Sequence, residues 1–157
     1  MSKYRVITDV DPHSTVSEQY RKLRTNIDFS NFNKEIKLIN LTSTYPGEGK
    51  TVTCINLATV YAQSKMKTLL IDLDLRKPKI HRAFQLPNKD GISSFVTNNH
   101  PIEDAIINVA ENLDVLVAGE KVPFPAELLV SKKIKEMFAD LKEKYDRVII
   151  DCPPLTA

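Results

Sequence analysis

Residues 43–53 of the chain read STYPGEGKTVT. The preceding stretch IKLINLTS (36–43) has the apolar character of a buried strand, and VTCINLATVYAQS (52–64) has the pattern of a helix. A glycine-rich loop between a strand and a helix usually binds a phosphate, because glycines let backbone N–H groups turn inward and the helix N-terminus adds positive charge. The stretch therefore predicts a nucleotide-binding loop, and a glycine turn that simply caps a helix is the alternative.

The residues of this loop follow the phosphate-loop pattern G-x-x-x-x-G-K-[ST], with Thr44 in place of the first glycine. Gly47 and Gly49 would shape the loop around an anion. Lys50 would reach the β- and γ-phosphates, and the Thr51 hydroxyl would bind Mg²⁺. The loop is thus a variant phosphate loop.

Acidic residues follow two further apolar stretches. Asp72 and Asp74 lie in LLIDLDLRKP (69–78), two positions apart, and strand alternation predicts that they share a face. Asp151 ends the apolar run VIID (148–151), the position of an acid that serves Mg²⁺. Because ligands bind beyond the carboxyl ends of parallel strands, these acids would lie beside the loop and bind Mg²⁺ or accept a proton. Solvated acidic strand ends are the alternative.

The remaining segments alternate between the sequence patterns of strands and of helices, and this alternation predicts an α/β fold with a parallel sheet. A helix is expected over 14–29, with a capping box of Thr15 and Glu18 and an apolar stripe that packs on the sheet. The other expected strands are 66–75, 113–119 and 146–154, and the other expected helices are a short one within 76–84 and those at 91–98, 102–108 and 122–145.

Composition indicates an ordinary globular domain. The chain has 157 residues, 42% of them hydrophobic and 27% charged, which is enough for one core without disulfides or metals. A net charge of +2 argues neither for nor against nucleic acid. The N-terminus lacks the apolar core of a signal peptide, and no apolar run is long enough to span a bilayer. Cys54 and Cys152 are expected to be packed, reduced thiols of a cytoplasmic protein.

Taken together, SxxPGEGK[ST], DxDxR and DxPP resemble the three-motif signature of the bacterial tyrosine kinases (BY-kinases) of capsular and exopolysaccharide clusters. EQYRKLR, with Glu18, Arg21 and Arg24, resembles the family's oligomerisation motif, and AGEKVPFPAELL (118–129) also resembles a family segment. The resemblance covers about residues 15–154. It implies a P-loop NTPase fold related to the deviant-Walker ATPases of partition and cell division, with 1–35 as an oligomerisation segment and 36–157 as the nucleotide-binding core of a single domain.

The same resemblance implies ATP and Mg²⁺ as cofactors and tyrosine as the phosphoryl acceptor, with autophosphorylation. Asp72 would be the base for the tyrosine hydroxyl, Asp74 would lie close to the metal, and Arg76 would lie near the phosphates or a neighbouring subunit. The implied catalytic residues are Lys50, Asp72 and Asp74. The implied nucleotide-binding residues are Pro46, Gly47, Glu48, Gly49, Lys50, Thr51, Val52 and Arg76. The implied metal ligands are Thr51, Asp72, Asp74 and Asp151.

The implied partners are further copies of the chain in a ring, a membrane-anchored activator that recruits the kinase to the inner face of the membrane, and tyrosine-bearing proteins, without nucleic acid. Partition-type relatives carry a lysine where this chain has Tyr45. Family catalytic domains also continue beyond the third motif, so the rest of the adenine pocket and the tyrosine-rich tail would lie outside this sequence. A partition-type ATPase switch and a truncated, inactive interaction protein are the alternative functions.

Overall fold

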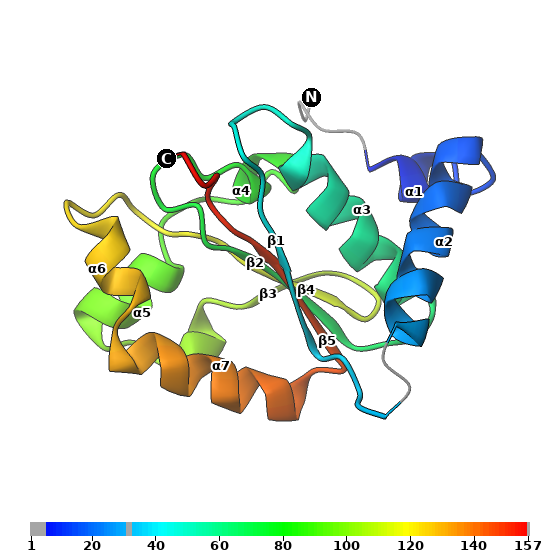
Figure 1. Ribbon diagram of the computed structural model, residues 1–157. Coiled ribbons are helices and arrows are strands. Elements are labelled where there is room, and N and C mark those ends of the chain that lie inside the picture. Colours follow the sequence, from blue (N-terminus) through cyan, green and yellow to red (C-terminus); the bar gives the residue numbers. More distant parts are fainter. Residues whose placement is uncertain (1–5, 31–32, 157) are drawn as a thin grey trace.

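A five-stranded sheet forms the centre of the molecule in the computed structural model, which describes residues 6–30 and 33–156 (Figure 1). The predicted oligomerisation segment 1–35 therefore lies partly outside the described residues. The strand order is β1-β5-β2-β4-β3, in which β1, β5, β2 and β4 are parallel and β3 pairs antiparallel with β4. The strands are β1 (Leu38–Leu41), β2 (Thr68–Asp72), β3 (Ile107–Ala110), β4 (Leu113–Leu116) and β5 (Arg147–Asp151). The mainly parallel α/β fold predicted from the sequence is confirmed.

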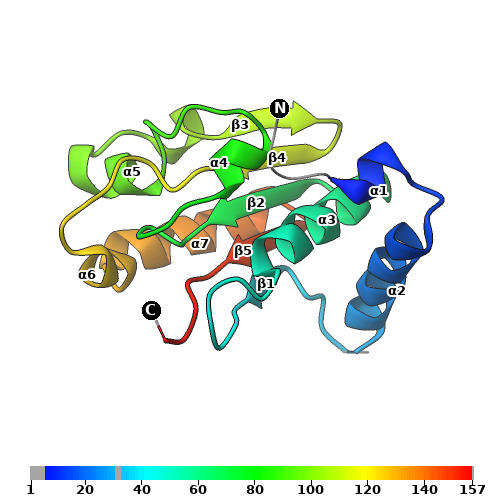
Figure 2. The same cartoon turned by 90° about the horizontal axis from the view of Figure 1, so that it is seen from above.

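Helices cover both faces of the sheet (Figures 1 and 2). One face carries α3, with α1 and α2 packed on its outer side, and the other carries α5, α6 and α7. The helices are α1 (Ile7–Val10), α2 (Thr15–Phe29), α3 (Lys50–Gln63), α4 (Ile80–Ala83), α5 (Ile92–Asn98), the 3₁₀ turn η1 (Ile102–Asp104), α6 (Pro125–Leu129) and α7 (Lys132–Lys144).

The central strands are apolar on both sides because both sides are covered. Every residue of β2 and of β5 is buried. Leu69 and Ile71 pack in the core beneath α7, whereas Leu70 between them packs in the core beneath α3. The same alternation holds in β5, and it places the last residues of both strands, Asp72 and Asp151, on the side of α3.

Several predicted boundaries are wrong, each for a local reason. The helix expected over 102–108 is only the turn η1, and the chain then enters β3, an antiparallel edge strand that the sequence analysis did not predict. The helix expected over 122–145 is divided, because the Ser131 hydroxyl accepts a hydrogen bond from the Ile134 amide and begins α7 anew. The strand expected over 66–75 ends at Asp72.

The N-terminal helices also differ from the prediction. The segment before His13 contains the short helix α1, and the cap of α2 is Ser14, which accepts from the Ser17 amide, rather than the predicted box of Thr15 and Glu18. α2 packs mainly on α3, and Tyr20 and Ile27 of its apolar stripe contact the core that α3 shares with the sheet. Val16 and Leu23 from that stripe are 52% and 37% exposed.

A search of the described residues found no helix that combines the length and the apolar character needed to cross a membrane.

Candidate nucleotide-binding site

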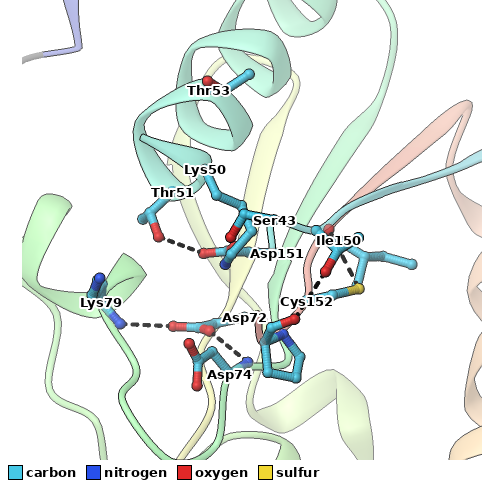
Figure 3. A network of polar contacts seen from close by, with 12 residues as sticks. Ser43, Lys50, Thr51, Thr53, Asp72, Asp74, Lys79, Ile150, Asp151 and Cys152 are labelled. Atoms are coloured by element: carbon cyan, nitrogen blue, oxygen red, sulfur yellow. Dashed lines mark hydrogen bonds and ion pairs between the residues drawn. The ribbon is translucent and has the colours of Figure 1, made fainter. Parts of the chain in front are cut away.

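The predicted site residues converge at the carboxyl ends of three neighbouring strands. The phosphate loop joins β1 to α3, Asp151 ends β5, and Asp72 ends β2. Since β5 pairs with both β1 and β2, it brings Asp151 between the loop and Asp72. The sheet order therefore assembles residues from positions far apart in the sequence (Figure 3).

Lys50 and Thr51, at the start of α3, both hold Asp151. The Lys50 ammonium forms an ion pair with one carboxylate oxygen of Asp151, and the Thr51 hydroxyl donates to the other at 2.8 Å (Figure 3). The Asp151 side chain is fully buried and that of Lys50 is 9% exposed. The phosphate-loop lysine thus lies at the head of β5, with its charge balanced inside the protein.

Asp72 is fully buried beside Asp151, with which it is paired in register across the two strands. One of its oxygens accepts from the Asp74 amide at 3.0 Å, and the other accepts from the Lys79 amide at 3.0 Å and the Ile80 amide at 3.2 Å. Burial raises the pKa of Asp72 to about 7, with a further rise from the nearby Asp151 carboxylate, against the lowering effect of the three amide bonds. Asp72 therefore organises the loop after β2 and holds a proton near neutral pH.

Asp74 lies in that loop, where its carboxylate accepts from the Lys77 amide at 3.1 Å. Because β2 ends at Asp72, strand alternation does not place the two acids on one face as predicted. Asp74 instead reaches the wall of a cavity of about 440 Å³ that opens beside the phosphate loop. Arg76, Lys77 and Lys79 line the same cavity and make it basic.

The two loop glycines have left-handed backbones, with φ of 81° at Gly47 and 80° at Gly49. A Cβ added at either would meet no heavy atom within 4 Å, so conformation rather than space calls for glycine here. Gly49 is also the N-terminal cap of α3 and offers no side chain to the first amides of that helix, which have no intrahelical partners. Both predicted loop glycines therefore adopt a backbone conformation that other residues rarely take.

Glu48, predicted among the nucleotide-binding residues, has a different neighbourhood. Its carboxylate accepts from the amides of Thr44, at 3.1 Å, and Tyr45, at 3.5 Å. It lines a second hollow, which shares Ser43 and Lys50 with the 440 Å³ cavity, rather than that cavity itself. The Glu48 carboxylate thus stabilises the backbone of the loop.

The cavity brings together most of the predicted residues and several that the sequence analysis missed. The predicted residues on its wall are Pro46, Gly47, Gly49, Lys50, Thr51, Val52, Asp74 and Arg76. Asp72 and Asp151 lie behind the wall. The missed residues are Ser43, Lys77, Lys79, Pro154 and Thr156. The run RKPK (76–79) after the second acidic motif was a signal for the two lysines, whereas nothing local indicated Thr156, whose hydroxyl donates to the Thr44 carbonyl.

The three residues of the predicted oligomerisation motif lie on α2, far along the chain from this cavity. Arg21 contacts Glu18 at 2.7 Å and the Pro12 carbonyl at 2.5 Å. Arg24 instead donates to the Val60 carbonyl at 2.7 Å, near the end of α3. The motif is thus divided between an exposed pair and an arginine that fastens α2 to α3.

Comparisons with known proteins agree with this architecture. A family model described as an AAA domain matches residues 36–157. Tyrosine-protein kinase YwqD of Bacillus subtilis is 46% identical over 153 residues, and the alignment covers 97% of this chain and 65% of YwqD. Tyrosine-protein kinase wzc of Salmonella typhimurium is 35% identical, with coverage of 94% of this chain and 21% of wzc. The chain thus spans about two thirds of the length of one relative and about a fifth of the other.

Solved structures of similar proteins have the same fold. The chimerical protein CapA2B2 superposes with a TM-score of 0.93 at 40% identity, covering 97% of this chain and 67% of CapA2B2. The kinase domain of VpsO superposes with a TM-score of 0.75 at 37% identity, covering 92% of this chain and 75% of that domain. The septum site-determining protein MinD of Pyrococcus horikoshii, solved with Mg-ADP, gives 0.65 at 27% identity over 75% of this chain and 49% of MinD. The chain therefore belongs to the AAA-domain proteins with a deviant phosphate loop, and among them to the family of bacterial tyrosine kinases.

Proposed function

We propose that this chain is the nucleotide-binding part of an ATP-dependent protein-tyrosine kinase that autophosphorylates and regulates capsular or exopolysaccharide synthesis. The observation that carries the proposal is the cluster of Lys50, Thr51 and Asp151 beside a basic cavity of about 440 Å³. Phosphoryl transfer needs a clamp for the phosphates, a hard metal and a proton acceptor, all held in fixed positions. This cluster and its two neighbouring acids supply residues of each kind.

The oxygen donors at the site fit Mg²⁺. No group of three or more His, Cys, Asp or Glu side chains within residues 6–30 and 33–156 is arranged to hold a metal alone. Mg²⁺ is usually held by one or two protein oxygens together with substrate phosphates and water, which matches the Thr51 hydroxyl and the Asp151 and Asp74 carboxylates. Bound there, the ion would neutralise charge that develops on the phosphates. MinD of P. horikoshii, which has the same fold, was solved with Mg-ADP.

The remaining step is the transfer of the proton from the acceptor tyrosine. We assign proton transfer to Asp72, because a carboxyl with a pKa of about 7 both accepts and releases a proton near neutral pH. The acceptor tyrosine's oxygen bonds to the terminal phosphoryl group of ATP, ADP leaves, and the phenolic proton passes to Asp72. Since the amides of residues 74, 79 and 80 occupy the oxygens of Asp72, the loop between Asp74 and Ile80 has to shift for this contact.

A partition-type ATPase switch is the second candidate, favoured by the similarity to MinD. Two observations favour the kinase instead. The identity to the kinase domain of VpsO is 37%, against 27% for MinD, and Tyr45 stands where partition-type relatives have a lysine. An interaction protein without transfer activity is the third candidate.

The proposal extends to assembly and location. Further copies of the chain would form a ring through the exposed pair Glu18 and Arg21, with Arg24 holding their helix in place. The kinase would act in the cytoplasm, brought to the inner face of the membrane by a membrane-anchored activator.

The test is to incubate the chain with ATP, Mg²⁺ and a tyrosine-bearing protein and to measure phosphotyrosine and free phosphate separately. The kinase produces phosphotyrosine, and Asp72→Asn abolishes it while ATP affinity, measured by calorimetry, persists. Asp151→Asn lowers the Mg²⁺-dependent affinity as well. Free phosphate without phosphotyrosine would favour the partition-type ATPase, and no ATP binding would favour the interaction protein.

A further inference from the structure

The cavity beside the phosphate loop is lined by three cations from the segment after β2, in addition to Lys50. These are Arg76, Lys77 and Lys79. The Lys50 ammonium forms an ion pair with the buried Asp151 carboxylate, so its charge is already balanced inside the protein. A phosphate that enters the cavity therefore meets the unbalanced positive charge on the side of the segment after β2, rather than on the phosphate loop.

One carboxylate, that of Asp74, lies on the same wall. It accepts a hydrogen bond from the Lys77 amide at 3.1 Å, and it forms no ion pair with any cation that the structure describes. Three cations against this one carboxylate leave an excess of two positive charges on the segment after β2. An excess of this sign beside a hollow attracts the polyphosphate chain of a nucleotide.

Lys79 differs from the other two cations of this segment in how firmly its backbone is held. Its amide donates to the buried Asp72 carboxylate at 3.0 Å (Figure 3), and its chain neighbours Pro78 and Ile80 are both buried. Lys79 itself is half-buried, whereas the other two cations are exposed. Because its backbone is fixed before a ligand arrives, Lys79 loses less conformational freedom on binding than a cation on a free loop.

The side chain of Lys79 has no partner in the described part of the chain. It makes no ion pair or hydrogen bond with any residue there, and the one bond at this position comes from the backbone amide. A lysine ammonium has three donors and no acceptor, and phosphate oxygens are acceptors that such a point charge binds well. The Lys79 ammonium is therefore available to a phosphate in the cavity.

The position of Lys79 indicates which phosphate it contacts. Its amide is bonded to Asp72, the proposed base, and a base has to lie next to the phosphoryl group that is transferred. Lys50 follows β1 and Lys79 follows β2, so the two lysines belong to segments on either side of β5. We propose that Lys79 binds the terminal phosphoryl group of ATP, as a second cation beside Lys50. This rests on the proposed kinase function for the ligand and for the role of Asp72.

The test is calorimetric titration of the chain, in the presence of Mg²⁺, with ADP and with an ATP analogue that has a non-hydrolysable β,γ bridge. Lys79→Gln is expected to weaken the analogue roughly tenfold, equivalent to about 1.4 kcal/mol, while the affinity for ADP stays within about twofold. Lys79→Arg keeps the charge and most of the affinity for the analogue. The free energy of unfolding of Lys79→Gln stays at the wild-type value, because the substitution preserves the amide that bonds to Asp72.

Two further variants serve as controls for charge. Lys34→Gln removes a positive charge from an exposed position before β1, at the end of the strand away from the cavity, and leaves both affinities unchanged. Lys77→Gln removes the same charge from the wall of the cavity itself, at an exposed side chain. Its loss of affinity for the analogue is expected to be smaller than that of Lys79→Gln, because its side chain is not held near Asp72.

Three outcomes would overturn the role of Lys79 while the chain still binds ATP. They are equal affinity of wild type and Lys79→Gln for the analogue, equal losses for the analogue and for ADP, and equal losses in Lys77→Gln and Lys79→Gln. The second would place Lys79 elsewhere along the nucleotide, and the third would reduce its effect to the overall charge of the cavity. A wild-type chain that binds neither nucleotide would instead overturn the proposed function together with this inference.

Discussion

The ammonium group of Lys50 contacts the carboxylate of Asp151, which lies 101 positions further along the chain. Both side chains are withdrawn from water, with exposures of 9% and 0%. A single buried ion pair thus connects the phosphate loop to the centre of the sheet. The same two charges would serve the phosphates and the metal, so the site is held in place by its own functional groups.

Removing Lys50 is expected to destabilise the fold as well as abolish nucleotide binding. Lys50→Met leaves the buried Asp151 carboxylate with Thr51 as its remaining side-chain partner, and breaking a buried pair in this way costs about 3–5 kcal/mol. Urea denaturation without nucleotide measures the loss. The double variant Lys50→Met with Asp151→Asn regains part of it, because no buried charge is left unpaired. Wild-type stability in Lys50→Met would mean that the pair does not form in solution.

Asp72 is expected to make the protein less stable as the pH rises toward neutrality. Its pKa rises from 3.8 in the ordinary state to about 7 in the folded chain. Between these values the unfolded chain has released the proton and the folded chain still holds it, so the free energy of unfolding falls with rising pH and levels off above about 7. The full effect is roughly 4 kcal/mol.

Denaturation curves between pH 4 and pH 8 for wild type and Asp72→Asn measure this effect. The variant lacks the titrating group and loses the corresponding slope. Asp140→Asn, an exposed site on α7, serves as the control and keeps the wild-type slope. An identical pH dependence in wild type and Asp72→Asn would show that Asp72 is charged throughout this range.

Arg147 is expected to stabilise the fold at a place remote from the nucleotide-binding site. Its guanidinium is 6% exposed and contacts Asp28 of α2 at 3.3 Å, Glu35 at 3.4 Å and the ring of Tyr61 at 5.4 Å from its centre. Asp28 also accepts from the Tyr61 hydroxyl at 2.8 Å. Asp28→Ala removes a partner from both the Arg147 guanidinium and the Tyr61 hydroxyl, and it should lower the free energy of unfolding by about 3 kcal/mol.

Glu35→Ala is the matched control for Asp28→Ala, because it removes a carboxylate from the same guanidinium. Glu35 is 58% exposed, so its loss should cost about 0–1 kcal/mol. Urea denaturation of both variants gives the comparison. Equal losses would mean that the two carboxylates share the buried charge equally.

The exposed pair on α2 is expected to hold copies of the chain together. Replacing Glu18, Arg21 and Arg24 together by alanine should dissociate a salt-sensitive oligomer, as light scattering at several protein and salt concentrations would detect. Lys22→Ala, an exposed substitution on the same helix, should leave assembly intact. A wild-type chain that stays monomeric at high concentration would refute assembly by this form of the protein.

The single substitution Arg24→Ala distinguishes the contact between α2 and α3 from assembly between chains. Because Arg24 donates to the Val60 carbonyl, its removal should lower the free energy of unfolding by about 1–3 kcal/mol. Glu18→Ala with Arg21→Ala should instead change the oligomeric state without such a loss. Thermal unfolding and light scattering on the two variants distinguish these effects.

Local sequence patterns were sufficient to predict the elements that depend on interactions between neighbouring residues. The strand, loop and helix over residues 36–64 were predicted from an apolar run, two glycines and a helical pattern, and the structure places them close to those bounds. Left-handed backbones at Gly47 and Gly49 follow directly from residue type. The acids that end β2 and β5 were predicted for the same reason, because a charged side chain after an apolar run marks the end of a buried strand.

Errors arose where short apolar segments fit more than one structure. Residues 107–110 have too few positions to distinguish a helix from a strand, and pairing with β4 decides in favour of the strand. Val16 and Leu23 fit a buried helical stripe, yet they are exposed, whereas Tyr20 and Ile27 of the same stripe pack against the core beneath α2. A loop lysine is normally solvated, and only the position of β5 buries the charge of Lys50.

The amino-acid sequence by itself thus determined the fold class, the phosphate loop and the identity of the three acids, since these depend on residues that are neighbours along the chain. The tertiary structure decided which of them meet. By inserting β5 between β1 and β2, it put Asp151 against both Lys50 and Asp72, and burial together with the Asp151 carboxylate raises the pKa of Asp72. By packing α2 on α3, it brought Arg24 to the end of α3. Charge burial and long-range contacts depend on sheet order and helix packing, and no pattern of neighbouring residues contains that information.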